Sequence, residues 1–395
     1  MNLTPNIKQH FPALANSDYV YLDSASSCQS PIQVINAISE YLIQGHGNPH
    51  RGMYNFSENA ENLLNECRNK VANFINASPE QIIFTKSTTE SLNLVAQSFR
   101  EKLNEGDTLI TSEMEHHANL LPWQRLQNLC GVRLKYIPIN SAAELDTSEL
   151  ESDLADNCKL LTICHTSNLL GTENPVEDII RLAQARGVPV VIDGAQMVAH
   201  HKVDVKALNC DYYAFSAHKM YGPAGIGVLY AKDPNTLSPL LLGGGIVSRV
   251  SKDKYSLLSG SQRFEAGTPN MLGVAGFSAA LDFVNQFQIA ELNSYNQELI
   301  ETTRGAIEQN GFKIISHPKS SNIVSFVHET FHSHDIATIL SANNIAVRAG
   351  HHCAQPCLNA LGYKQCVRVS TGSYNSMSDI ERFSKALSLV SEHLL

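Results

Sequence analysis

The chain has 395 residues, of which 43% are hydrophobic and 17% are charged, and its formal net charge is −9 at pH 7. This apolar content is sufficient for a folded core and excludes a disordered chain. Lys and Arg are concentrated nowhere, which argues against a nucleic-acid partner. No apolar run approaches the ~20 residues of a membrane span. Met1–Asp18 lacks the basic start and apolar run of a signal peptide, so we predict a cytosolic protein without membrane contact.

The nine cysteines are odd in number, and the first six are widely scattered. A disulfide scaffold would be a short, cysteine-dense chain, so we predict reduced thiols. Only Cys353, Cys357 and Cys366 form an organised group.

Short β-branched runs alternate with amphipathic helical patterns, for example at Ser91–Phe99 and Val176–Ala185. This alternation is typical of an α/β fold with a mostly parallel sheet flanked by helices. The predicted strands are Gln81–Thr85, Thr108–Thr111, Lys159–Cys164, Pro189–Asp193, Tyr212–Ser216 and Gly227–Tyr230.

The pattern changes after Gly243-Gly-Gly245. We predict a large α/β domain over residues 15–290 and a smaller α+β domain over residues 291–395, which the N-terminal segment 1–14 joins. The elements predicted in this part are a long helical stretch Leu272–Asn310, a strand Ser321–Phe326, a helix His334–Asn343, strands near Ala346 and Arg368, and a helix Ser378–Leu395.

Lys219 directly follows the predicted strand Tyr212–Ser216 and precedes a glycine-rich run. A lysine at the carboxyl end of such a strand points into the ligand crevice of an α/β sheet. Partial desolvation and nearby cations there lower the lysine pKa, so that the neutral amine can form an imine. The alternative is a surface lysine in a turn.

Asp193 stands at the end of its own apolar strand. Pyridoxal phosphate requires a carboxylate beside its ring nitrogen and a lysine for its aldehyde, and Asp193 and Lys219 would supply both. Taken alone, Asp193 could instead be a helix N-cap.

Thr88 and Thr89 lie where a predicted strand gives way to a helix. Backbone N–H groups at a helix start, together with hydroxyls, favour a phosphate site. The plain alternative is a capping box between Ser87 and Glu90, and the two arrangements are compatible.

Seven phrases in this order resemble the class V aminotransferases, which are fold type I pyridoxal-phosphate enzymes, and most closely the group II cysteine desulfurases of the SufS/CsdA type. The resemblance covers nearly the whole chain. It rests on Phe84-Thr-Lys-Ser-Thr-Thr-Glu90, Met114-Glu-His-His-Ala-Asn119, Thr166-Ser-Asn-Leu-Leu-Gly171, Ile192-Asp-Gly-Ala-Gln196, Phe215-Ser-Ala-His-Lys219, Arg263-Phe-Glu-Ala-Gly-Thr-Pro-Asn270 and Arg348-Ala-Gly-His-His-Cys-Ala354.

The resemblance implies a role for each matching residue. Lys219 would bind the cofactor aldehyde, and Arg368, with Arg348, would bind the substrate carboxylate. The other implied cofactor contacts are Asp193 to the ring nitrogen, Gln196 to the phenolic oxygen, His116 stacked on the ring with a role in proton transfer, Asn168 to cofactor or substrate amine, Thr88, Thr89, Ser216 and His218 to the phosphate, and Thr268 from a second subunit of a homodimer. The Leu- and Gly-rich segment 237–250 would lie at that dimer interface.

Cys353 lies among Arg348, His351 and His352, and positive neighbours favour the thiolate. We predict that Cys353 takes sulfur from L-cysteine as a persulfide. Two alternatives are a buried structural cysteine and a zinc site of His351, His352, Cys353 and Cys357. We predict no metal at His116 and His117, because adjacent histidines rarely point the same way.

The resemblance implies a cysteine desulfurase that releases L-alanine and supplies iron–sulfur cluster assembly. The short cysteine loop predicts dependence on an acceptor protein of the SufE/CsdE type. Two interpretations of Cys357 and Cys366 stay open: they accept the sulfur from Cys353, or they are incidental. The alternatives are a selenocysteine lyase acting on L-selenocysteine, another pyridoxal-phosphate reaction such as an epimerase or a kynureninase-like lyase, and a non-catalytic sulfur-relay subunit.

Overall fold

The computed structural model describes residues 7–50, 52–154, 157–287, 289–320 and 322–394. Ser321 and Leu395, at the ends of two predicted elements, lie outside the described residues, as does part of the N-terminal segment 1–14. None of the described helices is long and apolar enough to cross a membrane.

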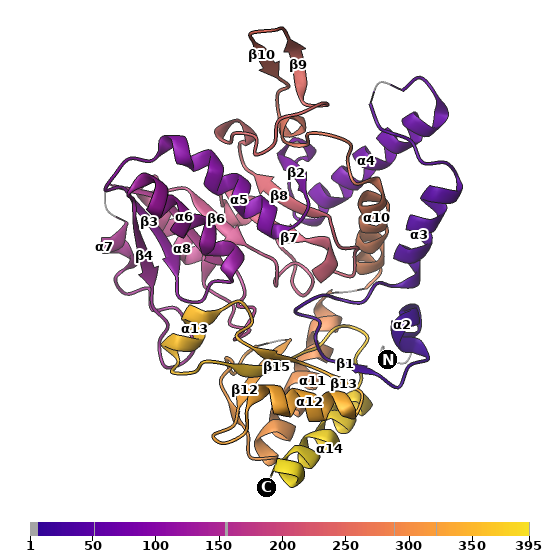
Figure 1. The fold of residues 1–395 in the computed structure, drawn as a ribbon, viewed down its shortest axis with the longest axis vertical. Coiled ribbons are helices and arrows are strands. Elements are labelled where there is room, and N and C mark those ends of the chain that lie inside the picture. The colour runs from indigo at the N-terminus through magenta and orange to yellow at the C-terminus, as the bar shows by residue number, and fades with distance from the viewer. Residues whose placement is uncertain (1–6, 51, 155–156, 288, 321, 395) are drawn as a thin grey trace.

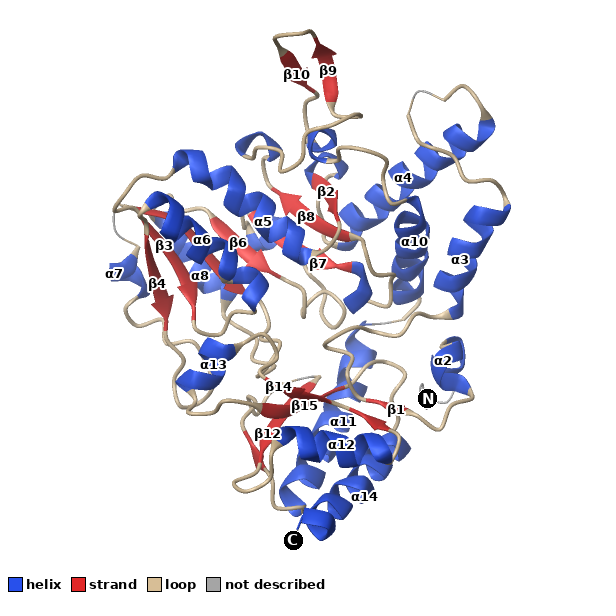
Figure 2. Cartoon of the chain, in the orientation of Figure 1, coloured by secondary structure: helices blue, strands red, loops and turns tan. Residues whose placement is uncertain are grey.

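A seven-stranded sheet forms the centre of the larger lobe (Figures 1 and 2). Every neighbouring pair is parallel except those that involve β8, which runs antiparallel to both of its neighbours. The predicted mostly parallel sheet is therefore confirmed. In spatial order the strands are β2 (Ile82–Thr85), β8 (Gly227–Ala231), β7 (Tyr212–Ser216), β6 (Val190–Asp193), β5 (Cys158–Cys164), β3 (Thr108–Ser112) and β4 (Arg133–Ile137).

Helices cover both faces of this sheet, because its strands are apolar on both sides. In β6, Val191 packs on the face covered by α5 (Thr88–Phe99) and α6 (Leu121–Cys130). Val190 and Ile192 pack on the opposite face, with α4 (Asn55–Phe74), α8 (Val176–Ala185) and α10 (Met271–Asn285). Outside this layer, α3 (Ile32–Ile43) packs against α10. The carboxyl ends of the parallel strands are left facing the second lobe (Figure 1).

The second lobe contains an antiparallel sheet in the order β11 (Lys313–Ile314), β12 (Ile323–Val327), β15 (Cys366–Ser370) and β14 (Arg348–Gly350). The short strand β1 (Val20–Tyr21) pairs with β13 (Ile345–Ala346), so an N-terminal segment lies against this lobe. The domain division near residue 290 stays a prediction. The helices of the lobe are α11 (Ile289–Gln309), α12 (Ser333–Ala342), α13 (Gln355–Ala360) and α14 (Met377–Leu394).

The remaining α-helices are short, and one hairpin projects from the larger lobe. These elements are the helices α2 (Pro12–Ala15), α7 (Leu150–Asp153) and α9 (Val205–Leu208), and the hairpin of β9 (Val247–Val250) and β10 (Tyr255–Leu257) (Figure 1).

The long helical stretch predicted over Leu272–Asn310 is two helices, α10 and α11. Gln286 and Phe287 donate their N–H groups to the carbonyls three residues earlier, at Phe283 and Val284. Such bonds tighten the last turn and end a helix.

Candidate active site

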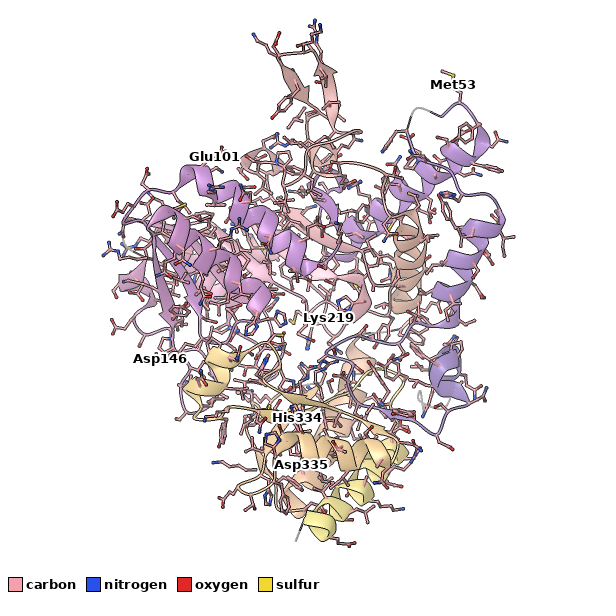
Figure 3. The ribbon with its side chains drawn as sticks, viewed as in Figure 1. Met53, Glu101, Asp146, Lys219, His334 and Asp335 are labelled. Atoms are coloured by element: carbon pink, nitrogen blue, oxygen red, sulfur yellow. The ribbon has the colours of Figure 1, made fainter. Side chains whose placement is uncertain are left out.

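A cavity of about 240 Å³ opens where the carboxyl ends of the parallel strands face the second lobe. Figure 3 shows Lys219 at this junction. Thr268 does not line the cavity of the single chain and lies in a separate hollow. The predicted site residues that do line it are Thr88, Thr89, His116, Asn168, Asp193, Gln196, Ser216, His218, Lys219, Arg348, Cys353 and Arg368.

Asp193 is the last residue of β6, and Lys219 lies in the 3-10 turn that follows the neighbouring strand β7. Burial lowers the pKa of the Lys219 amine, although the nearby Asp193 carboxylate acts in the opposite direction. Burial raises the pKa of Asp193, which Lys219 and the N–H of Ala195 counteract; that N–H donates to Asp193 Oδ1 at 3.0 Å. The cavity therefore contains the Lys219 amine, which burial makes easier to deprotonate, and the Asp193 carboxyl group, which the Ala195 N–H holds in place.

His116 follows β3 and begins a turn of 3-10 helix over His117–Asn119. Its Nδ1 accepts the Ala118 N–H at 3.0 Å. Burial, with the nearby Lys219 charge, lowers the pKa of His116 to about 3. The imidazole is therefore neutral at physiological pH, which suits a ring that stacks on a ligand.

The first turn of α5 opens into the cavity without a side-chain cap. The predicted capping box is wrong: Glu90 accepts the N–H of Lys86 rather than that of Ser87. The Thr88 N–H instead reaches the Ser216 hydroxyl at 2.7 Å, and the Thr88 hydroxyl shares a 2.6 Å bond with it. Uncapped N–H groups and clustered hydroxyls form the kind of helix start that binds phosphate.

Gly227→Ala is expected to weaken cofactor binding about tenfold, since overpacking costs about 1–3 kcal/mol. A Cβ at Gly227 would lie 2.6 Å from Ser87 Cα and 3.0 Å from the Phe215 carbonyl oxygen, so the start of α5 would have to move. The measurement is the cofactor dissociation constant by fluorescence quenching. Gly305→Ala, whose Cβ would meet nothing within 4 Å, is the control, and equal affinities in the two variants would contradict the argument.

Gln196 and His218 lie on the side of the cavity where the N-terminal segment 25–28 crosses it. Gln196 Nε2 donates to the Ala25 carbonyl at 2.7 Å, and His218 Nδ1 shares a 3.4 Å bond with Ser27 Oγ. Hydrogen bonds to the segment 25–28, which is distant in sequence, therefore orient both side chains.

Cys353 lies in the four-residue link 351–354 between β14 and α13. His352 and Cys353 have positive φ angles of 50° and 53°, a conformation that non-glycine residues adopt only when their surroundings hold them there. Here the Cys353 carbonyl accepts the His117 N–H at 2.8 Å, and the His352 carbonyl accepts Asn168 Nδ2 at 2.8 Å. These bonds to the larger lobe hold a partly exposed thiol at the cavity.

Asn168 joins the cavity to the second lobe. Its side-chain amide nitrogen donates to the His352 carbonyl in residues 351–354, here called the cysteine link, and its backbone carbonyl accepts Arg368 Nη1 at 2.8 Å. Its side chain also lines the cavity, and its predicted contact with cofactor or substrate amine stays a prediction.

Cys357 and Cys366 are fully buried. Burial raises the pKa of both thiols, that of Cys366 to about 12, so neither is a ready thiolate. Among the described residues, no group of three or more His, Cys, Asp or Glu side chains is arranged to hold a metal ion. His351, His352, Cys353 and Cys357, the residues of the zinc alternative, form no such group in this structure.

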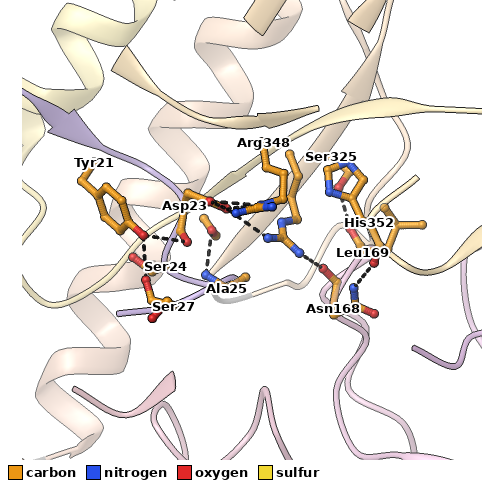
Figure 4. Close-up of polar contacts among 12 residues, drawn as sticks. Tyr21, Asp23, Ser24, Ala25, Ser27, Asn168, Leu169, Ser325, Arg348 and His352 are labelled. Atoms are coloured by element: carbon orange, nitrogen blue, oxygen red, sulfur yellow. Dashed lines mark hydrogen bonds and ion pairs between the residues drawn. The ribbon is translucent and has the colours of Figure 1, made fainter. Parts of the chain in front are cut away.

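The sequence patterns did not predict two buried acidic residues that contact residues lining the cavity. Asp23 binds Arg348 (Figure 4) and Arg368, and its one sequence signal is its place after the apolar run Val20-Tyr-Leu22. Glu115 precedes His116 and accepts the Ser112 hydroxyl and the Asn119 amide, both at 2.6 Å. Burial raises the pKa of Glu115 to about 7.

Two buried histidines, His165 and His200, make the free energy of unfolding depend on pH. Burial lowers the pKa of His165 and of His200 to about 4, whereas an unfolded histidine titrates near 6.5. Between these values only the unfolded chain binds the proton. Each histidine therefore lowers the free energy of unfolding by about 1.4 kcal/mol per pH unit as the pH falls.

His200→Gln is expected to flatten that dependence by up to about 1.4 kcal/mol per pH unit. Urea unfolding of wild type and variant between about pH 4.5 and 6.5 measures it. Parallel curves for the two proteins would contradict the assignment of a neutral, buried His200.

Comparison with known proteins agrees with this geometry. The sequence family described as aminotransferase class-V matches residues 20–383. A probable cysteine desulfurase of Vibrio cholerae is 40% identical over 390 residues, 96% of each chain. Two solved structures superpose with TM-scores of 0.94 at 36% identity: the cysteine desulfurase of Thermococcus onnurineus, with 98% of each chain covered, and the cysteine desulfurase CsdA of Escherichia coli, with 100% of each covered.

These similarities extend over the whole chain rather than over isolated motifs. They confirm the fold predicted from the resemblance, that of the fold type I pyridoxal-phosphate enzymes. The chain belongs to the class V aminotransferase family.

Proposed function

We propose that this protein is a cysteine desulfurase that removes sulfur from L-cysteine, releases L-alanine and keeps the sulfur as a persulfide on Cys353. One observation carries the proposal: Cys353 lines the same cavity as Lys219 and Asp193. A thiol in that position has no use in an epimerase. The relatives named cysteine desulfurase support the same activity.

The cavity residues fit pyridoxal phosphate. The uncapped start of α5 and the Ser216 hydroxyl suit its phosphate, Asp193 suits the pyridine nitrogen, and the buried Lys219 amine suits its aldehyde. Thr89, His218 and Gln196 complete the proposed contacts. When bound, the cofactor supplies an electron sink that allows the bond between Cβ and sulfur of the substrate to break.

The protein's own side chains would bind the substrate, move protons and accept the sulfur. Arg368 and Arg348 bind the substrate carboxylate, and Lys219 and the neutral His116 move protons. The Cys353 thiolate attacks the substrate sulfur, so that an S–S bond forms as the Cβ–S bond breaks. The electron pair of the broken bond remains with the three-carbon fragment, which takes up a proton and leaves as L-alanine.

The test is to quantify alanine after incubating the purified protein with L-cysteine and a thiol reductant, with L-selenocysteine as a second substrate. Alanine from L-cysteine is expected. If alanine forms from L-selenocysteine alone, the protein is a selenocysteine lyase and the proposal is contradicted. If alanine forms from neither substrate, the protein catalyses another reaction of this family.

The proposal extends to a homodimer. In the single chain Thr268 lies outside the cavity, as a residue that serves a neighbouring subunit would. Leu241 and Leu242 nearby are 47% and 61% exposed, which a subunit interface would cover. Sedimentation equilibrium tests this arrangement, and a monomer with full cofactor affinity would contradict it.

The proposal also includes a separate sulfur-acceptor protein of the SufE/CsdE type. Residues 351–354 are tied to the larger lobe through His117 and Asn168, which would keep a persulfide on Cys353 at the cavity. Turnover is therefore expected to rise when such an acceptor is added, and unchanged turnover would contradict this part. The cytosolic location stays a prediction.

A further inference from the structure

Asp23 is shared between two arginines that line the cavity. Its carboxylate accepts Arg348 Nη2 at 2.8 Å and Arg348 Nε at 3.1 Å, and it accepts Arg368 Nη2 at 3.1 Å (Figure 4). Asp23 follows β1, whereas the arginines lie on the neighbouring strands β14 and β15. The contact joins the segment after β1 to the two strands of the second lobe whose arginines line the cavity.

One nitrogen of the Arg368 guanidinium, Nε, has no hydrogen-bond partner among the described residues. The Arg368 side chain is 3% exposed and its Nε is buried, whereas Nη1 donates to the Asn168 carbonyl and Nη2 to Asp23. A buried donor without an acceptor costs about 1–3 kcal/mol. The same side chain lines the cavity, and Nη1 and Nη2 each carry a second N–H that could bind a ligand there.

The charges of this group also point to the ligand. Arg348 and Arg368 carry two positive charges and Asp23 carries one negative charge, so the group has one positive charge in excess. A single carboxylate would neutralise it, and planar guanidinium groups bind carboxylates through paired hydrogen bonds.

We propose that Asp23 is the positioning residue of the substrate-carboxylate subsite. It holds the guanidinium of Arg368 against the Asn168 carbonyl, with the remaining donors left for the ligand, and it keeps Arg348 folded over the cavity. This inference rests on the proposed function and adds to it the residue that sets the preference for amino acids with a free carboxylate.

The test compares two ligands that differ only at the carboxyl group, L-alanine and L-alaninamide. Their dissociation constants are read from the change in visible absorption of the bound cofactor in the holoenzyme. In Asp23→Asn the dissociation constant for L-alanine is expected to rise about tenfold, the loss of one charge-assisted hydrogen bond. That for L-alaninamide is expected to change less than about twofold. With L-cysteine, KM rises and kcat is retained.

A buried carboxylate far from the cavity provides the matched control. Asp379 is 4% exposed and pairs with Lys8 at 3.2 Å, and Asp379→Asn is expected to leave the ratio of the two dissociation constants unchanged. If Asp23→Asn does not fold, Asp23→Glu keeps the negative charge but displaces the carboxylate that both arginines contact, and it is expected to raise the dissociation constant for L-alanine relative to that for L-alaninamide.

An unchanged ratio in Asp23→Asn, or an equal weakening of both ligands, would overturn the inference and leave Asp23 a structural bridge. Failure of the proposed function is a separate result, because L-alanine binding requires no desulfuration. It would show as an absence of alanine release by the wild-type protein.

Discussion

Cys353→Ala is expected to lower alanine release from L-cysteine by ~10³-fold or more, the order seen when an enzyme loses its nucleophile. The substrate sulfur would then have no acceptor on the protein. The cofactor absorption should persist, because Cys353 lies on the cysteine link and not on the strand ends that would hold the cofactor. Alanine is quantified by chromatography under identical cofactor loading.

Cys357→Ala is the matched control for that variant. Cys357 lies on α13, four positions after Cys353, and is fully buried. Its loss should leave alanine release within about twofold while removing a small buried group, at a cost of roughly 1 kcal/mol. Equal losses of activity in the two variants would mean that Cys353 has no special role.

Lys219→Ala is expected to abolish both turnover and the covalent attachment of the cofactor. Lys219 is the lysine that lines the cavity of the described chain, and burial lowers its pKa, so its amine is the one suited to bond an aldehyde. Borohydride reduction followed by peptide mass mapping measures the attachment directly.

Lys232→Ala serves as the control, since Lys232 is an exposed residue whose amine donates to Asn209. In wild type and in this control, the reduced cofactor should be found on the peptide that contains Lys219. Finding it on another lysine, or unchanged turnover in Lys219→Ala, would contradict the assignment.

The sequence patterns predicted most of the strands that carry the chemistry. Strands such as β6 and β7 are buried apolar runs that end in functional residues, Asp193 and Ser216, and this signal is local. The edge strand β4 was missed because Arg133, Lys135 and Tyr136 are exposed there, so no apolar run marks it. The end of α10 was missed because the apolar pattern of the sequence continues past it, whereas Gln286 and Phe287 donate to carbonyls only three residues earlier.

The parts of the site that the sequence did not predict depend on contacts distant along the chain. Asp23 reaches Arg348 and Arg368 across 325 and 345 positions, and no spacing rule connects them. The conformation of the cysteine link likewise depends on His117 and Asn168. Ser87 and Glu90 have capping-box spacing, yet Ser216, from another strand, binds the first turn of α5.

The most direct measurement is mass spectrometry of the protein after one turnover with L-cysteine, without reductant and with free thiols blocked afterwards. The proposed function predicts one added sulfur atom on the peptide that contains Cys353, in amounts equal to the alanine released. Alanine formed with no added sulfur on Cys353, or with the sulfur on another cysteine, would contradict it.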